Sequence, residues 1–252
     1  MEEPLTILYT ANLRGDLERL PRLHTFLRGL KNLPPADEPD VMLCAVEPVA
    51  RRILLLDAGN ACAPDAWHCA ATGGRSALIV LDAMGYQAVN VAGFLTAESR
   101  ARLDANYLGM ALVDEAHPWQ SGTITVICGD NVGAHGGASP SQDSPNLQGE
   151  GSLRIVLPGD SPNPAKNVGA KHASPVPENP PGLRPSPTEN VIYLPPVAAL
   201  QVGVIHVAWE NHVPVIRART TLDMPPSTPP DPTITSAVEF VLAEARRYGE
   251  LG

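Results

Sequence analysis

The sequence has few aromatic residues, few cysteines and no long hydrophobic run. Aromatic residues make up 4% of the 252 residues, so Leu, Val, Ile and Ala must supply most of a hydrophobic core. No segment approaches the roughly 20 consecutive apolar residues that a membrane-spanning helix needs, and the acidic start Met-Glu-Glu-Pro differs from a secretory signal. We therefore expect a soluble, cytoplasmic protein with no membrane partner.

Basic residues are outnumbered by acidic ones. The chain has 18 Lys and Arg against 27 Asp and Glu, which gives a formal net charge of −9. A surface of that sign repels the phosphate backbone of nucleic acids, so nucleic acid is not an expected partner. A small anionic ligand at a local site, or another protein, is compatible with this charge.

The four cysteines do not suggest a disulfide framework. The chain is long and shows no export signal, and in such chains cysteines are usually thiols. Cys62, His68 and Cys69 lie close together in the sequence, which leaves a metal site and a local disulfide as alternatives. Their spacing is not that of the paired ligands in zinc sites, and we expect ordinary thiols.

Hydrophobic periodicity predicts an α/β domain. Leucines three and four residues apart predict an amphipathic helix from Leu17 to Leu30, with Pro21 in its first turn and His24 on its solvent side. The expected strands are 5–9, 53–56, 88–91, 110–113, 153–157, 191–194, 202–209 and 213–220, and the other helices are 76–84, 96–106 and 233–248. Thr96 can cap the second of these helices. The alternation of strands and helices predicts a parallel sheet flanked by helices, and the last two strands predict a hairpin.

One segment breaks this alternation. Between Gly129 and Asn190 the chain contains 11 prolines and 9 glycines. Such a composition buries too little apolar surface to offset the entropy lost on ordering. We expect a single domain over 1–252, ordered at about 5–128 and 190–248, with 129–189 as an irregular, mobile excursion.

Three segments at the expected strand ends resemble the opening of a calcineurin-like metallophosphoesterase domain. They are Leu5–Gly15 (LTILYTANLRG), Ile53–Asn60 (ILLLDAGN) and Gly74–Phe94 (GRSALIVLDAMGYQAVNVAGF). In the 5′-nucleotidase and UDP-sugar hydrolase branch, three apolar strands are followed by the motifs T-N-D-x-H-G, D-x-G-D and G-N-H-[DE], in that order. A helix that ends in L-G-Y-D-A precedes the third strand. The closing hairpin and a D-P-x-[IV] helix at Asp231 are also similar. The resemblance implies a metallophosphoesterase-like layered sheet with flanking helices, closed by a C-terminal β-hairpin and helix.

The metal-binding positions of that pattern carry other residues here. Asn12 stands where the first metal-binding Asp is expected, Arg14 where the first His is expected, and Asn60 where an Asp bridges two metals. Gly93 and Phe94 replace an Asn ligand and the His that stabilises the transition state. Two divalent ions about 3.5–4 Å apart need anionic and imidazole ligands, and Arg14 adds positive charge instead. The resemblance therefore implies a degenerate site without catalytic residues and without a metal cofactor.

Simpler explanations exist for several of these residues. Asn12 and Asn60 suit turns, because the Asn side chain bonds local backbone and tolerates the left-handed conformation. Phe94 either fills the vacated site as a core residue or stacks on a ligand. The family's later histidines would fall within the proline-rich segment.

The function expected from these features is that of a non-catalytic 5′-nucleotidase-like protein with a binding or structural role. One alternative is a phosphoesterase with a reduced site, in which Asp57, Asn60 and a histidine from the proline-rich segment hold a divalent metal such as Mn or Zn. Another is a sensor of an anion or nucleotide that uses Arg14, Asp57 and Asn60. If Arg14 takes the place of the metal charge in the crevice, its expected carboxylate partner is Asp16, Asp57 or Asp65; otherwise it is a surface charge.

Overall fold

The computed structural model describes residues 3–32, 52–104, 108–129, 152–158 and 190–250. The segment predicted to be a mobile excursion lies outside these residues, except for Gly129 and residues 152–158. That part contains a strand, as predicted from the apolar run 153–157.

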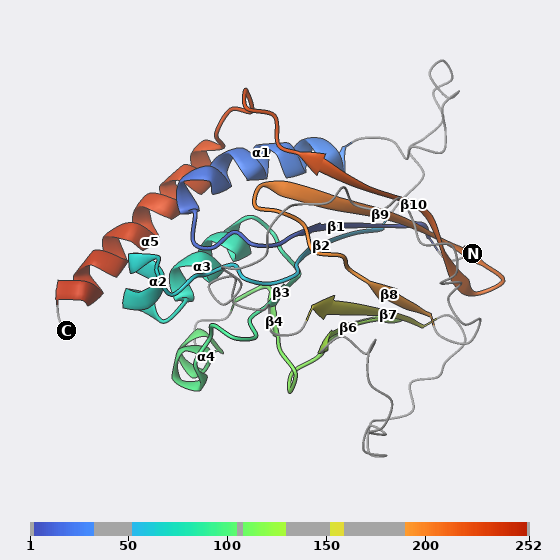
Figure 1. Cartoon of the computed structure of the whole chain (residues 1–252), viewed down its shortest axis with the longest axis horizontal. Helices are drawn as coiled ribbons and strands as arrows, with labels where there is room; N and C mark the ends of the chain where they lie inside the picture. Colours follow the sequence, from blue (N-terminus) through green and yellow to red (C-terminus); the bar gives the residue numbers. More distant parts are fainter. Residues whose placement is uncertain (1–2, 33–51, 105–107, 130–151, 159–189, 251–252) are drawn as a thin grey trace, which may run out of the picture.

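The larger sheet combines parallel and antiparallel strands (Figure 1). It has six strands in the order β10-β9-β1-β2-β3-β4 among the described residues. They are β1 (Leu5–Thr10), β2 (Arg52–Asp57), β3 (Ala88–Asn90), β4 (Ala111–Val113), β9 (Gln201–Glu210) and β10 (Val213–Asp223). Strands β1 to β4 run parallel, while β9 runs antiparallel to β1 and forms a hairpin with β10. The parallel sheet and the hairpin are both as predicted.

The smaller sheet has four strands in the order β5-β6-β7-β8 in the described part of the chain. They are β5 (Trp119–Ser121), β6 (Ile124–Gly129), β7 (Leu153–Pro158) and β8 (Val191–Tyr193). Strands β6, β7 and β8 are parallel, and β5 pairs antiparallel with β6. Neither β5 nor β6 was predicted, although the alternating burial of β6 is the period of a half-buried strand.

Helices pack on the face of the larger sheet that points away from the smaller one (Figure 1). They are α1 (Leu20–Lys31), α2 (Trp67–Thr72), α3 (Arg75–Ala83), α4 (Ala97–Asp104) and α5 (Pro232–Glu250), and a short 3₁₀ helix, η1 (Leu17–Arg19), precedes α1. Pro21 lies in the first turn of α1, and the Thr96 hydroxyl accepts a 3.1 Å hydrogen bond from the Ser99 amide as the cap of α4. No helix among the described residues combines the length and apolar character that crossing a bilayer requires.

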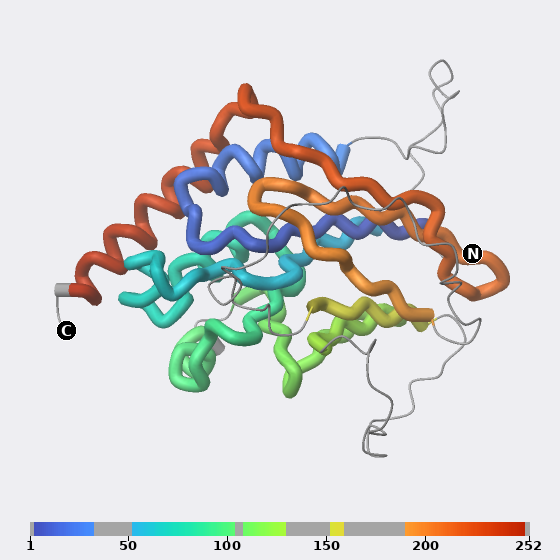
Figure 2. Tube along the Cα trace, in the orientation of Figure 1, coloured from blue at the N-terminus to red at the C-terminus, as the bar shows by residue number. Residues whose placement is uncertain are grey.

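Two hydrophobic clusters hold these layers together. Successive side chains of a strand point to opposite faces of its sheet. Accordingly, Leu5, Ile7 and Tyr9 of β1 pack in the cluster between the two sheets, whereas Leu8 packs with the helices. The layers of helices, larger sheet and smaller sheet can be followed along the chain in Figure 2. The fold is the layered α/β arrangement expected from the sequence, closed by the hairpin and α5.

Asp231 fixes the start of α5 against α1. Its Oδ1 accepts hydrogen bonds from the amides of Thr233 and Ile234, at 2.9 and 3.2 Å. Its Oδ2 lies 3.2 Å from a guanidinium nitrogen of Arg28 and 3.2 Å from Nδ1 of His24. The prediction that His24 faces solvent is therefore wrong, because α5 covers that side of α1.

Replacing Asp231 with alanine is expected to lower the free energy of unfolding by about 2–3 kcal/mol, because it removes a helix cap and a charged bond together. Replacement with asparagine keeps an oxygen that can accept from Thr233 and Ile234 but loses the charge and the oxygen that accepts from Arg28, so it should cost less, about 1 kcal/mol. Urea unfolding of the three proteins measures both differences. An alanine variant as stable as the wild type would contradict this role of Asp231.

Candidate functional site

The loops that follow β1 and β2 lie side by side at one edge of the larger sheet. The carboxyl ends of parallel strands meet at the same edge, where ligands bind in open α/β sheets. Here the amide of Asn12 donates to the carbonyl of Gly59 at 2.9 Å, and the amide of Arg14 donates to the carbonyl of Asn60 at 2.9 Å. The parallel register of the two strands thus continues into their loops and places Asn12 beside Asn60.

Asn12 and Asn60 bond to each other through their side chains. The Asn60 amide nitrogen donates to Oδ1 of Asn12 at 3.0 Å, and the Asn12 amide nitrogen donates to the carbonyl of Val197 at 2.8 Å. Both residues have positive φ, 56° and 61°. The turn interpretation therefore holds for their backbone, and we call the two side chains the amide pair. Val197 precedes β9, so the amide pair also ties the edge of the sheet to the chain leading from β8 to β9.

Asn90, which the sequence analysis did not single out, bonds the two sheets together at this edge. It is the last residue of β3 and is buried. Its amide nitrogen donates to the carbonyl of Ala58, beyond β2, at 3.0 Å and to the carbonyl of Pro158, at the end of β7, at 2.8 Å. Its Oδ1 accepts from the amide of Ala92. A polar residue at the end of an apolar strand was the one signal for it in the sequence.

Arg14 lies at the surface beside this edge. Its backbone has φ 52°, and its guanidinium lies 3.6 Å from Oδ2 of Asp65, with both side chains largely exposed. Asp65 is thus the partner among the three carboxylates considered from the sequence. An exposed pair of this kind stabilises a fold by at most about 1 kcal/mol.

Gly93 and Phe94 lie in the loop after β3. Gly93 is exposed with φ 80°, a conformation that suits glycine. The Phe94 ring is half-buried against Gly74, where an added Cβ would lie 2.9 Å from its Cδ2. Gly74 is the N-cap of α3. The ring therefore packs on the start of a helix.

Asp57 is fully buried at the end of β2. Its Oδ2 accepts from the Thr10 hydroxyl at 2.8 Å, and its Oδ1 accepts from the Gly59 amide at 3.0 Å. The single Thr10 hydroxyl proton is directed to Asp57, so the Tyr86 hydroxyl, 2.9 Å away, donates to Thr10. Burial raises the pKa of Asp57 to about 7, against the lowering effect of these two bonds. Burial, and then the charge of Asp57, raise the pKa of Tyr86 above its usual 10.0.

These residues do not fit the two-metal centre that the sequence resemblance implies. Two divalent ions close together need anionic ligands, whereas the amide pair presents neutral amide oxygens, which are weaker ligands than carboxylates, and the Asn12 oxygen already accepts from Asn60. Asp57 directs both oxygens to hydrogen-bond donors within the core, and Arg14 supplies positive charge at the surface. Among the described residues, no three His, Cys, Asp or Glu side chains gather in a way that could hold a metal ion.

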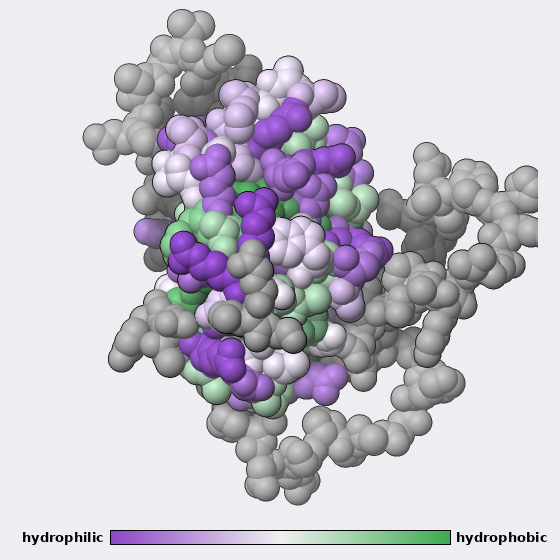
Figure 3. Space-filling model, turned by 90° about the vertical axis from the view of Figure 1, so that its left-hand side faces the viewer, coloured by the Kyte–Doolittle hydropathy of each residue, from purple (hydrophilic) through white to green (hydrophobic). Residues whose placement is uncertain are grey.

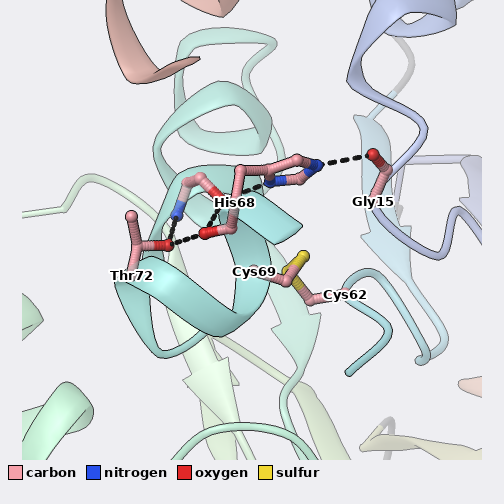
Figure 4. Close-up of a disulfide and its surroundings, with 6 residues drawn as sticks. Gly15, Cys62, His68, Cys69 and Thr72 are labelled. Atoms are coloured by element: carbon pink, nitrogen blue, oxygen red, sulfur yellow. Dashed lines mark hydrogen bonds between the residues drawn. A yellow bond between two sulfur atoms is a disulfide. The ribbon is translucent and has the colours of Figure 1, made fainter. Parts of the chain in front are cut away.

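Cys62 and Cys69 form a disulfide, with Cα atoms 5.9 Å apart (Figure 4). The expectation of ordinary thiols was wrong for this pair, and the local disulfide was the correct alternative. The loop between them folds back through a hydrogen bond from the Cys69 amide to the Ala66 carbonyl, which brings the two cysteines together. His68 is held by Ser76 and Gly15 through its two ring nitrogens and does not join the cysteines in a metal site.

The chain resembles a solved phosphoesterase in its fold. It aligns with the crystal structure of the calcineurin-like phosphoesterase YfkN from Bacillus subtilis at a TM-score of 0.53 and 13% identity, over 98% of this chain and 99% of that one. No protein-family model matches the sequence, and no curated protein matches it either. The layers, the closing hairpin and helix, and this alignment together identify the fold as that of a calcineurin-like phosphoesterase.

Proposed function

We propose that this protein is a non-catalytic, degenerate relative of 5′-nucleotidase-type metallophosphoesterases, with a binding or structural role. The amide pair carries the proposal. Asn12 and Asn60 occupy the strand ends where the resemblance expects metal-binding aspartates, and they bond to each other and to Val197. A neutral amide oxygen is a weaker ligand for a divalent ion than a carboxylate is. An aspartate pair at the same place would repel itself unless a cation lay between the two.

The two remaining charged candidates also support a non-catalytic role. Among the described residues, Asp57 is the carboxylate that lies at the end of β2, but turning it toward a metal would break its bonds with Thr10 and Gly59. Arg14 is paired with Asp65, so its charge is partly neutralised at the surface. Neither residue is placed to hold the ion from which a metal-bound hydroxide would attack phosphorus.

Purified protein incubated with Mn²⁺ or Zn²⁺ and then desalted is expected to retain less than one equivalent of metal. It should not hydrolyse p-nitrophenyl phosphate, bis-p-nitrophenyl phosphate or nucleotides above the rate of the buffer with metal. Elemental analysis and a colorimetric phosphate assay give the two results. Stoichiometric metal, with turnover that Asn60→Ala removes, would overturn the proposal and favour a phosphoesterase with a reduced site.

A variant with the family residues restored tests the reason for the missing metal. It carries Asn12→Asp, Arg14→His, Asn60→Asp, Gly93→Asn and Phe94→His. If these positions form one site, two carboxylates and two imidazoles meet at the strand ends, and Mn²⁺ affinity measured by calorimetry should rise well above that of the wild type. Asn211→Asp is the control for a single added carboxylate, since it places one at an exposed turn with positive φ far from this edge. An unchanged affinity in the restored variant would show that these positions do not form one site.

A further inference from the structure

A pocket of about 350 Å³ lies next to the strand-end loops, on the side of α2 and α5. Its walls are residues 15–18, which lead from β1 into η1, residues 65–68, which lead into α2, and Leu242 and Arg246 of α5. We call it the α2–α5 pocket. Figure 3 faces this end of the molecule and shows hydrophilic side chains interspersed with smaller hydrophobic areas. The pocket takes no part in the amide pair or in the Asp57 network.

The disulfide closes the loop that forms one wall of this pocket. Cys62 follows the β2 loop and Cys69 lies in α2, so residues 65–68 fall wholly inside the covalent ring (Figure 4). Both cysteines are buried in the cluster under the helices. Asp65 and Trp67, between them, are exposed. The buried side of this wall is therefore anchored by the disulfide, and its outer side, with Asp65 and Trp67, faces solvent.

The inner side of the loop is packed without space against Gly15. An added Cβ on Gly15 would lie 2.8 Å from Cβ of Ala66, 3.0 Å from Sγ of Cys69 and 3.2 Å from Cε1 of His68. Nε2 of His68 donates to the Gly15 carbonyl at 2.9 Å, and Nδ1 then accepts from the Ser76 hydroxyl at 2.7 Å. If the two cysteine sulfurs move apart, the loop cannot shift toward Gly15, because that side is filled. It must shift toward solvent instead.

We propose that the Cys62–Cys69 disulfide is a redox switch that sets the shape of the α2–α5 pocket. A disulfide holds two sulfurs about 2 Å apart, whereas two thiols separate to contact distances of roughly 3.5–4 Å. Because the Gly15 side is filled, the reduced pair moves residues 63–68 outward. This movement displaces Asp65, Trp67 and His68 from their places in the pocket wall.

The reductant is a dithiol. One of its thiolates attacks a cysteine sulfur, which breaks the Cys62–Cys69 bond and forms a mixed disulfide. Its second thiol then displaces the other cysteine, and the dithiol leaves as a cyclic disulfide. Two electrons and two protons pass to Cys62 and Cys69, which become thiols. Since both sulfurs are buried, attack follows a local opening of the exposed loop and does not require the sheet to unfold.

Hydrogen exchange of the full chain with and without dithiothreitol tests the switch. The amides of Cys69 and Ala70, which bond to the Ala66 carbonyl, are expected to lose protection on reduction, while those of β1 and β9 keep theirs. Fluorescence emission of Trp67 should shift to longer wavelength, and the shift should be absent in Trp67→Phe. Equal exchange in the two redox states, or loss of protection throughout the chain, would overturn the proposal.

Two cysteine variants and one rate measurement complete the test. The double variant Cys62→Ser, Cys69→Ser should show the exchange pattern of the reduced protein and no response to dithiothreitol. Cys128→Ser, outside the pair, should respond as the wild type does. The rate of reduction, followed by alkylation and mass spectrometry, should depend weakly on urea. A rate that rises with urea as steeply as global unfolding would show that the disulfide is a structural crosslink and not a switch.

Discussion

Replacing Gly203 with alanine is expected to lower the free energy of unfolding by roughly 3 kcal/mol or more, the upper end of the range for overpacking a core, or to prevent folding. Gly203 lies in β9 directly opposite Tyr9 of β1, and both residues are buried. An added Cβ would lie 2.1 Å from the Cε1 and Cζ atoms of the Tyr9 ring. Because that ring is enclosed between the two sheets, it cannot turn aside without leaving the core.

The matched control for this substitution is Gly29→Ala in α1. A Cβ at Gly29 meets nothing within 4 Å, so alanine there should stabilise the protein by roughly 0.5–1 kcal/mol. Combining Gly203→Ala with Tyr9→Val removes the ring that the new methyl group meets. The double variant should therefore lose less stability than the two single variants added together. Urea unfolding of the set measures these differences, and a Gly203→Ala protein of wild-type stability would contradict the packing of β1 on β9.

Asp57 should make the protein less stable as the pH rises from about 4 to 7. Burial raises the pKa of this carboxyl from 3.8 to about 7, so the folded chain holds its proton more tightly than the unfolded chain does. Between these values the unfolded chain loses the proton first, and the free energy of unfolding falls. The contribution of Asp57 to the free energy of unfolding is fully present below pH 3.8. At about 1.4 kcal/mol per pH unit, the free energy of unfolding falls by about 4 kcal/mol at most by pH 7.

The variant Asp57→Asn isolates this effect, because it has no proton to lose and leaves the other titrating groups in place. Its amide oxygen can accept from Gly59, and its nitrogen can donate to Thr10. The stability of the asparagine variant relative to wild type should increase by several kcal/mol between pH 4 and pH 8, measured by urea unfolding at each pH. A difference that does not change with pH would mean that Asp57 is not titrating in a buried site.

The order of most strands and helices could be predicted because these elements carry a local signal, whereas α2, β5 and β6 were missed. The leucine spacing from Leu17 to Leu30 indicates one apolar face, and α1 buries Leu20, Leu23 and Leu27. The apolar run before Asp57 is typical of a strand covered on both faces, as β2 is. Strand β5 gave no such signal, because its three residues remain partly exposed at a sheet edge.

The candidate site could be predicted only in part, for a physical reason. Parallel strands bring their carboxyl ends to one edge, so the proximity of Asn12 and Asn60 follows from the order of the strands. The bonds to Val197 and Pro158 join segments far apart in the chain, and no local pattern encodes them. Cysteines seven residues apart leave thiols and a disulfide both open, and the sequence favoured thiols, whereas the structure has a disulfide. The fold of the intervening loop decides among these.

The position of β1 has a consequence for synthesis of the chain on the ribosome. Thr6 of β1 pairs with His206 of β9, 200 residues later. At a synthesis rate of about 5–20 residues per second, β9 is made roughly 10–40 s after β1. During that time the edge of β1 that later bonds β9 is open, next to the apolar side chains of Leu5, Ile7 and Tyr9. A chain cut short before β9 would keep this edge exposed and should aggregate, so nascent chains of this protein depend on protection until translation is nearly complete.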